Sequence, residues 1–160
     1  MQTVDRRRMQ APADLVFNAA RDVERWPELL SHYRWVTIRE RRPGSCIVEM
    51  AAYRPFGPLN YPTWWVSEMW VDREALEVRY RHVAGITRGM DVVWRVVPDG
   101  PATDVTIVHD WNGPPWPLIG NWAADHVIGP VFIHGIASRT LAGIAREVES
   151  IPKPQPASKA

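Results

Sequence analysis

The sequence predicts an α+β domain in which a curved, seven-stranded antiparallel sheet surrounds one long C-terminal helix. Two observations carry this prediction. Apolar residues recur at helical spacing from Asn121 to Ser150, with charged residues on the opposite side. Most of the chain before Asn121 instead alternates apolar and polar residues, which is typical of half-buried strands. Such a sheet cannot leave its inner face in water, so we expect the helix to cover it.

The first thirty residues predict one strand followed by two short helices. Residues 2–9 form the strand, although its arginines dilute the alternation. Asp14 is placed to cap a helix over residues 15–20, and Asp22 to cap another over residues 23–30. The second helix contains Trp26-Pro27, so we expect it to make only one or two turns.

The other six strands are predicted as three consecutive pairs. The pairs are residues 33–42 with 45–53, 62–72 with 75–83, and 88–97 with 103–112, each separated by turn-forming residues. Two prolines and a glycine predict a loop over residues 54–61. Pro130 predicts a kink or break within the long C-terminal helix.

Length and composition indicate one domain over residues 1–151 and a disordered, proline-rich tail over residues 152–160. The 160 residues include 19 basic and 18 acidic side chains, a balance that gives no reason to expect nucleic acid as a partner. The single cysteine, Cys46, cannot form an internal disulfide, which fits a reducing compartment. We see no apolar run long enough to span a membrane and no signal peptide, and therefore predict a cytoplasmic protein.

The composition is unusual in its nine tryptophans. Tryptophan is large and carries an N–H that needs a partner when it is buried. Nine exceed what a small core needs, so some are expected to line a cavity or its rim. The alternative, that all belong to the core or are scattered on the surface, is equally compatible with the sequence.

Two segments near the N-terminus carry a family resemblance. The stretch APADLVF at residues 11–17, followed by DVERWPEL at residues 22–29, resembles the START-like, helix-grip superfamily (SRPBCC). Within that superfamily the chain is most similar to the polyketide cyclase/dehydrase family, which includes bacterial polyketide aromatase/cyclases. The resemblance implies a deep apolar cavity and a cofactor-independent cyclisation and dehydration of a hydrophobic polyketide or aromatic precursor. The alternative is a non-catalytic binding or transfer protein for a lipid, quinone or aromatic metabolite.

Strand periodicity predicts which side chains enter that cavity. We assign His109 or His134 as the acid/base, because imidazole titrates near neutral pH and His134 lies seven residues before Leu141 on the helix. The resemblance implies a cavity position for Tyr33, which with Ser67 would donate hydrogen bonds to substrate oxygens. The expected ligand contacts are Trp26, Trp35, Trp65, Ser67, Met69, Tyr80, His82, Met90, Trp94, Ile107, Trp111, Val131 and Ser138.

The chain departs from the aromatase/cyclase pattern at Met69, which stands where those enzymes carry an arginine. If the protein is an enzyme, histidines are therefore expected to replace that arginine. The alternative is that an inward histidine is a hydrogen-bonded structural residue. Three inward histidines from separate elements show no ligand spacing, so no metal is predicted. The cyclisation that the resemblance implies needs no cofactor.

The remaining expectations concern the surface. His32 and His126 are predicted at the surface or mouth, and Cys46 as a structural thiol. Trp64 and Trp70 alternate outward, where they could form a homodimer surface, unless the register is off by one. The cavity entrance is predicted near residues 54–61, 83–88 and 113–120. The expected partners are a hydrophobic small molecule and an acyl carrier protein that presents it.

Overall fold

The computed structural model of the protein describes residues 1–56, 59–113 and 133–151. These residues form a seven-stranded sheet in the order β1-β7-β6-β5-β4-β3-β2, in which every pair is antiparallel. The elements are β1 (Gln2–Met9), α1 (Ala13–Arg21), the 3-10 helix η1 (Val23–Arg25), α2 (Trp26–Leu29), β2 (Tyr33–Arg42), β3 (Ser45–Phe56), β4 (Leu59–Asp72), β5 (Glu77–Gly85), β6 (Asp91–Asp99), β7 (Ala102–Asp110) and α4 (His134–Ser150).

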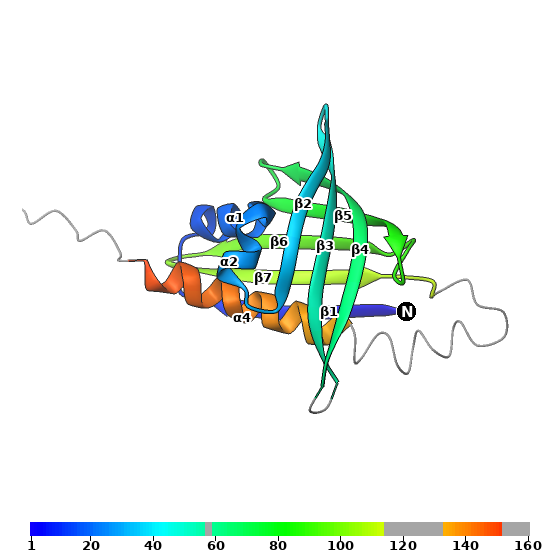
Figure 1. Ribbon diagram of the computed structural model, residues 1–160. Coiled ribbons are helices and arrows are strands. Elements are labelled where there is room, and N and C mark those ends of the chain that lie inside the picture. The colour runs from blue at the N-terminus through cyan, green and yellow to red at the C-terminus, as the bar shows by residue number, and fades with distance from the viewer. Residues whose placement is uncertain (57–58, 114–132, 152–160) are drawn as a thin grey trace, which may run out of the picture.

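The helices lie on one side of the curved sheet (Figure 1). Helix α4 runs along this face and contacts β1, β3, α1 and α2, while α1 and α2 close one end of the sheet. The predicted fold class is therefore confirmed, including the two short helices after the first strand. No helix of the described residues is long and apolar enough to cross a membrane.

Alternating burial confirms the predicted inward faces of β4 and β5. In β5, Val78, Tyr80 and His82 are buried while the residues between them are exposed. Trp65, Ser67 and Met69 of β4 are likewise buried. The helix buries the stripe formed by Ala137, Leu141, Ile144, Ala145 and Val148 against this face. One face of the sheet and one face of α4 thus enclose the core.

The predicted loop over residues 54–61 is wrong. Strand β3 continues to Phe56 and β4 begins at Leu59, with Arg54 paired to Tyr61. β2 pairs with β3 only as far as Ala52, and β5 pairs with β4 only from Trp65 onward. Among the described strands, the tip of this hairpin is therefore a ribbon that pairs with no third strand, and such edge positions tolerate proline.

The predicted helix caps are also wrong in detail. Helix α1 begins earlier than expected, with Pro12 at the N-cap and Asp14 inside the first turn. There the carboxylate lies near the positive end of the helix dipole. The second helix is split into η1 and α2, and Asp22 makes no side-chain cap bond. Pro27 lies at the start of α2, where a missing N–H costs no helical hydrogen bond.

The long C-terminal helix is confirmed from His134 to Ser150. The expectations for Asn121 to Phe132, including the kink at Pro130 and the positions of His126 and Val131, lie outside the described residues. The same holds for residues 114–120 at the predicted entrance and for residues 152–160 in the tail.

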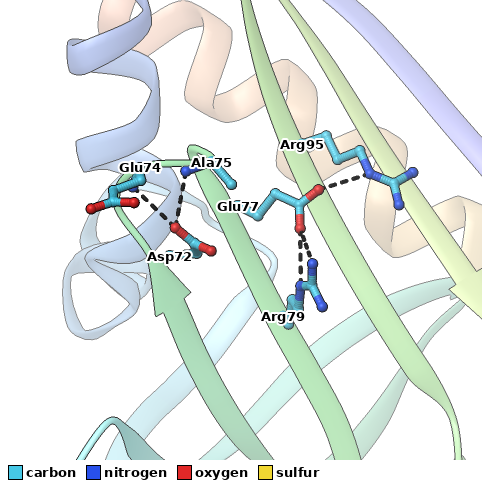
Figure 2. A network of polar contacts seen from close by, with 6 residues as sticks. All are labelled: Asp72, Glu74, Ala75, Glu77, Arg79 and Arg95. Atoms are coloured by element: carbon cyan, nitrogen blue, oxygen red, sulfur yellow. Dashed lines mark hydrogen bonds and ion pairs between the residues drawn. The ribbon is translucent and has the colours of Figure 1, made fainter.

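The turn between β4 and β5 fixes the end of the sheet where α1 packs. The Asp72 carboxylate accepts hydrogen bonds from the backbone N–H groups of Glu74 and Ala75, at 3.0 and 2.9 Å (Figure 2). Next to this turn, the Glu77 carboxylate accepts bonds from Arg79 and Arg95, so that it joins β5 to β6. The opposite end of the same strands is left to form the mouth of a cavity.

Candidate functional site

A cavity lies between α4 and the buried face of the sheet. Its hollow has a volume of about 700 Å³, part of which is the open mouth. Nine of the residues expected at the site line it: Trp26, Tyr33, Trp65, Tyr80, His82, Met90, Trp94, Ile107 and His109. Helix α4 and the residue before it contribute Ile133, Ile136, Ala137 and Thr140. A mostly apolar lining with a few polar groups is the usual form of a small-molecule site.

The walls are built from aromatic rings that contact one another. Trp26 meets Tyr33 edge to face at 5.2 Å between centroids and lies 5.6 Å from Trp94. Tyr33 also approaches Trp65, at 6.2 Å. The Trp26 indole is anchored by a 3.0 Å hydrogen bond to the Ala19 carbonyl. Mutually packed rings of this kind present flat, rigid surfaces that suit a flat, conjugated ligand.

His82 is held firmly at the cavity wall. Its Nδ1 lies 2.6 Å from the Thr87 hydroxyl, and its ring stacks on Trp65 at 6.0 Å and 12°. Burial, with a smaller contribution from nearby His109, lowers the His82 pKa to about 3. The imidazole is therefore neutral at pH 7, with one donor and one acceptor nitrogen.

His109 occupies a similar environment. Its Nδ1 lies 3.3 Å from the Thr3 hydroxyl, and burial lowers its pKa to about 3. Threonine hydroxyls thus engage the δ nitrogens of both histidines, while no hydrogen bond from a described residue reaches either ε nitrogen.

Two hydroxyl groups at the site have no hydrogen-bond partner within the described residues. They are the Tyr80 Oη, which lines the cavity, and the Ser67 Oγ, which lies just behind the lining beside His82 in the β4–β5 ladder. Burial raises the pKa of Tyr80 well above its usual value, so this phenol stays protonated. A buried hydroxyl without a partner costs free energy that a ligand oxygen would recover.

His134 does not face the cavity, contrary to the expectation from helical spacing. It is the first residue of α4, and its Nδ1 bonds the buried Asp5 carboxylate on β1 while 62% of its side chain is exposed. The cavity is lined instead by Ile133, Ile136, Ala137 and Thr140. His134 is therefore separated from His109 and His82 as a candidate acid/base.

Four further residues that were expected to contact the ligand lie outside the cavity lining, and Val131 is outside the described residues. Trp35 lies on the outer face, 38% exposed beneath Arg34, because a bulge between Tyr33 and Trp35 breaks the alternation of β2. Trp111 is buried and donates its N–H to the Arg88 carbonyl. Met69 lines a separate groove near Cys46, and Ser138 is half-buried outside the lining.

The structure adds polar residues that sequence reasoning missed. His32 was expected at the surface or at the mouth of the cavity, but it is buried and its Nε2 lies 3.0 Å from the Thr140 hydroxyl. Burial lowers the His32 pKa to about 4, with nearby Arg139 and Arg146 contributing less. Thr140 follows Ile133, Ile136 and Ala137 at helical spacing, so extending that stripe along the helix would have found it.

Trp64 lies on the outward face, as predicted, whereas a structural role for the Cys46 thiol stays a prediction. Trp64 is 43% exposed on the outward face, donates its N–H to Glu49 at 2.6 Å, and reaches the rim of the cavity. Cys46 is half-buried in β3, and burial raises the pKa of its thiol, which keeps it protonated. Within residues 1–56, 59–113 and 133–151, no three His, Cys, Asp or Glu side chains are grouped to hold a metal ion.

Comparison with known proteins begins with a family model. Residues 9–127 match the model described as "Polyketide cyclase / dehydrase and lipid transport". The chain is 38% identical over 94 residues to the Streptomyces cyaneus protein named "Putative polyketide cyclase". That alignment covers 56% of this chain and 60% of the relative, so the chain matches less than two thirds of the relative's length.

Solved structures share the fold. The Zhui aromatase/cyclase from Streptomyces sp. R1128 superposes with a TM-score of 0.78 at 19% identity, covering 93% of each chain. A START superfamily protein from Mycobacterium smegmatis gives a TM-score of 0.64 at 16% identity, covering 92% of this chain and 94% of that one. At these identities the likeness establishes the architecture alone.

Proposed function

Because the chain belongs to the polyketide cyclase/dehydrase and lipid transport family, we propose that it is a cyclase-like enzyme that cyclises and dehydrates a hydrophobic polyketide or aromatic precursor. One observation carries the proposal. Two neutral imidazoles, those of His82 and His109, and the Tyr80 phenol line a cavity with rigid aromatic walls. The Tyr80 hydroxyl has no hydrogen-bond partner among the described residues. This combination supplies what an aldol condensation needs, namely a fixed substrate shape, a proton acceptor and hydrogen-bond donors.

The aromatic walls would fix the shape of the substrate. A poly-β-ketone chain folded between Trp26, Trp94 and Trp65 is held with its reacting carbons close together. The surrounding apolar side chains exclude water, which strengthens each polar contact inside the cavity. Binding alone therefore supplies part of the rate enhancement.

His109 would act as the proton acceptor and donor. Its Nε2 takes a proton from a carbon between two carbonyl groups, and the resulting carbanion attacks a ketone carbon to form the new C–C bond. The alkoxide formed by this attack takes the proton back from the imidazolium. In the dehydration, a second carbon-bound proton leaves to the imidazole, and the hydroxyl leaves as water after that proton is transferred to it.

The low pKa of His109 sets a condition on this step. With a pKa of about 3 in the empty cavity, the imidazolium is strongly disfavoured at pH 7. The negative charge that develops on the substrate enolate lies beside the ring and offsets this penalty. Tyr80 donates its hydroxyl proton to an enolate or carbonyl oxygen, so that both charges of the transition state are stabilised.

The experiment replaces His109 by glutamine, which keeps hydrogen-bonding capacity and similar volume but cannot accept a proton in this pH range. Purified protein is added to a minimal aromatic polyketide synthase, and the products are compared by chromatography and mass spectrometry. We expect His109→Gln to reduce the rate of formation of the redirected product by about 100-fold. The matched control is Arg81→Gln, on the exposed side of β5 next to His82, which should leave the product pattern unchanged.

The second candidate function is a carrier for a flat hydrophobic metabolite. The observation that favours it is the uncharged lining, since no described residue that lines the cavity is a lysine or arginine and Met69 stands where the resemblance to aromatase/cyclases expects arginine. If the wild-type protein leaves the product pattern unchanged while anthraquinone still quenches its tryptophan fluorescence, the cyclase proposal fails and the carrier function takes its place. Delivery of the substrate by an acyl carrier protein and homodimer formation remain predictions.

A further inference from the structure

A second hollow lies at the end of the sheet that α1 and α2 close (Figure 1). It is a groove of about 790 Å³, part of which is open to solvent, between α1 and η1 on one side and β2, β3 and β4 on the other. Its apolar lining consists of Val23, Ile38, Cys46, Met69 and Val71. We call it the back groove, because the mouth of the cavity lies at the opposite end of the strands.

The back groove has an apolar floor and a charged rim. Arg41 of β2 and Glu24 of η1 line it and form an ion pair of 2.9 Å, with 70% and 51% of their side chains exposed. Such an exposed pair contributes little to stability. Val23 and Met69, in contrast, are almost completely buried. The groove therefore offers an apolar surface inside and charged groups at its opening to solvent.

The back groove and the cavity adjoin each other along both walls. On the sheet side, Met69 lines the groove and pairs with Tyr80 on the next strand, which lines the cavity. Neighbouring strands lie about 4.8 Å apart, so these two side chains occupy adjacent positions on the same buried face. On the helix side, Val23 of η1 lines the groove and Trp26 at the start of α2 lines the cavity. The two hollows thus follow one another along the same interface between helices and sheet.

Met69 fills the place where the two hollows would meet. Its side chain is 3% exposed and belongs to the buried core together with Trp26 and Tyr80. Trp26 is fixed by its hydrogen bond to the Ala19 carbonyl, and both aromatic residues form the wall on the cavity side. The methionine side chain is unbranched and apolar, so truncating it removes packing and leaves no polar group without a partner.

We propose that Met69 closes the inner end of the cavity and thereby determines which ligands fit: the cavity takes a flat ring system, and an alkyl tail on that ring system gains no contact with the back groove. Met69 is then a specificity-determining residue and not a catalytic one. The inference rests on the proposed function only for the cavity as a ligand site. Binding tests it without turnover, so it can fail or succeed independently of catalysis.

The test compares 2-methylanthraquinone with 2-pentylanthraquinone, which has the same ring system and a longer tail. Binding is measured by quenching of tryptophan fluorescence. In the wild type we expect similar affinities, because the tail has no access to the back groove. In Met69→Ala the pentyl probe should bind about tenfold more tightly than the methyl probe, which corresponds to burial of about two methylene groups.

Met9→Ala is the matched control. Met9 is fully buried at the end of β1, separated from β4 by three strands, and lines neither hollow. It loses the same atoms as Met69→Ala, so the two probes should keep similar affinities although the core is weakened. Met69→Leu keeps the bulk of the side chain and should also behave like the wild type. Circular dichroism confirms that each variant is folded.

Cys46 reports directly on the back groove. It is the only cysteine of the chain, it lines the groove, and it pairs with Met69 in the β3–β4 ladder. The rate of its reaction with 5,5′-dithiobis(2-nitrobenzoate) is measured with and without each probe. In Met69→Ala, the pentyl probe at about ten times its Kd should slow this reaction about tenfold, whereas the methyl probe should not. In the wild type neither probe should slow it.

Each outcome decides the inference. Similar affinities of the two probes in folded Met69→Ala would refute the role of Met69 as the closed end of the cavity. If Met69→Ala does not fold, the wild type decides alone. A pentyl probe that protects Cys46 in the wild type has passed Met69 and refutes the inference, whereas similar affinities with an unprotected Cys46 uphold it.

The same measurements keep the inference apart from the proposed function. Loss of length selection with intact anthraquinone binding would remove the inference and leave the proposed function standing. A length-selective protein that leaves polyketide products unchanged would uphold the inference and remove only the enzymatic function. If neither probe binds the wild type or any variant, the cavity is no site for flat aromatic ligands, and both are refuted.

Discussion

Acidification from about pH 6.5 toward about pH 4.5 is expected to remove much of the folding stability of this protein. His82, His109 and His32 are buried, and burial lowers their pKa values from 6.5 to about 3, about 3 and about 4. Below about pH 6.5 the unfolded chain binds protons that the folded protein excludes. The stability from these groups is therefore fully present above that pH and is lost as the pH falls toward the folded-state pKa values.

The size of this effect follows from linkage. Each histidine that is protonated only in the unfolded state contributes about 1.4 kcal/mol per pH unit, so three together approach about 4 kcal/mol per pH unit near pH 5. This is large against a typical total stability of about 5–15 kcal/mol. Asp5, whose pKa is raised mainly by burial, takes up its proton in the folded protein and offsets part of the loss.

Urea denaturation followed by tryptophan fluorescence at half-unit steps from about pH 8 to about pH 5 measures the slope. Above about pH 7 these histidines should leave the free energy of unfolding nearly independent of pH. Below about pH 6 that free energy should fall steeply. Replacing His82 by glutamine should reduce the slope by about a third. If the wild type shows no greater slope than this variant, the histidines are not held neutral in the folded protein.

The second large effect is expected at Gly85, where β5 meets the rim of the cavity. Gly85 has a φ of +94°, and an added Cβ would lie 2.6 Å from the Trp64 carbonyl oxygen and 2.9 Å from the Trp65 Cα. Both contacts are with backbone, which cannot move aside without shifting β4. Gly85→Ala should therefore destabilise the fold by about 2–4 kcal/mol, combining the unfavourable φ with the clash.

Gly89 provides a matched control at the other end of the same turn. Its φ is +87°, but nothing lies within 4 Å of an added Cβ. Gly89→Ala should therefore cost only about 1 kcal/mol for the backbone conformation. Urea denaturation of the two variants isolates the steric part of the effect. Equal losses in both variants would mean that Trp64 and Trp65 do not approach Gly85 as closely as the structure describes.

Gly85→Ala should also weaken ligand binding. The turn between Gly85 and Gly89 carries Thr87, whose hydroxyl holds His82 at 2.6 Å, and Gly85 pairs with Trp65, on which the His82 ring stacks. Displacing either partner moves His82 away from its position on the wall. The cavity rim thus depends on a glycine that no catalytic argument would have selected.

Periodicity was sufficient to predict the layers of this fold. The alternation in β5 and β6 identified Tyr80, His82 and Trp94 as inward residues, and the structure buries them. Burial of one sheet face is a property of the local sequence, because a shift of one residue would place every apolar side chain in water. The same reasoning failed at Trp35, where a bulge after Tyr33 reverses the faces.

The candidate site was predicted only in part. His109 and His82 lie on regular strands, so their inward direction followed from the alternation of side chains between the two faces of a strand. His134 was misplaced because helical spacing gives only an approximate direction at the first residue of a helix, where the nearby Asp5 carboxylate decides the contact. His32 was missed because it precedes β2 in an irregular segment that shows no period.

The sequence by itself therefore determined the order of elements, the buried face of each regular strand and the apolar, aromatic character of the interior. Only the tertiary structure decided which polar groups meet there. His32 and Thr140 lie 108 residues apart in the chain, and their side chains meet where the segment before β2 packs against α4. The hydrogen bond between them exists only once these two elements touch. Burial has a local signature because it repeats along one element, whereas hydrogen-bond direction depends on partners that distant elements supply.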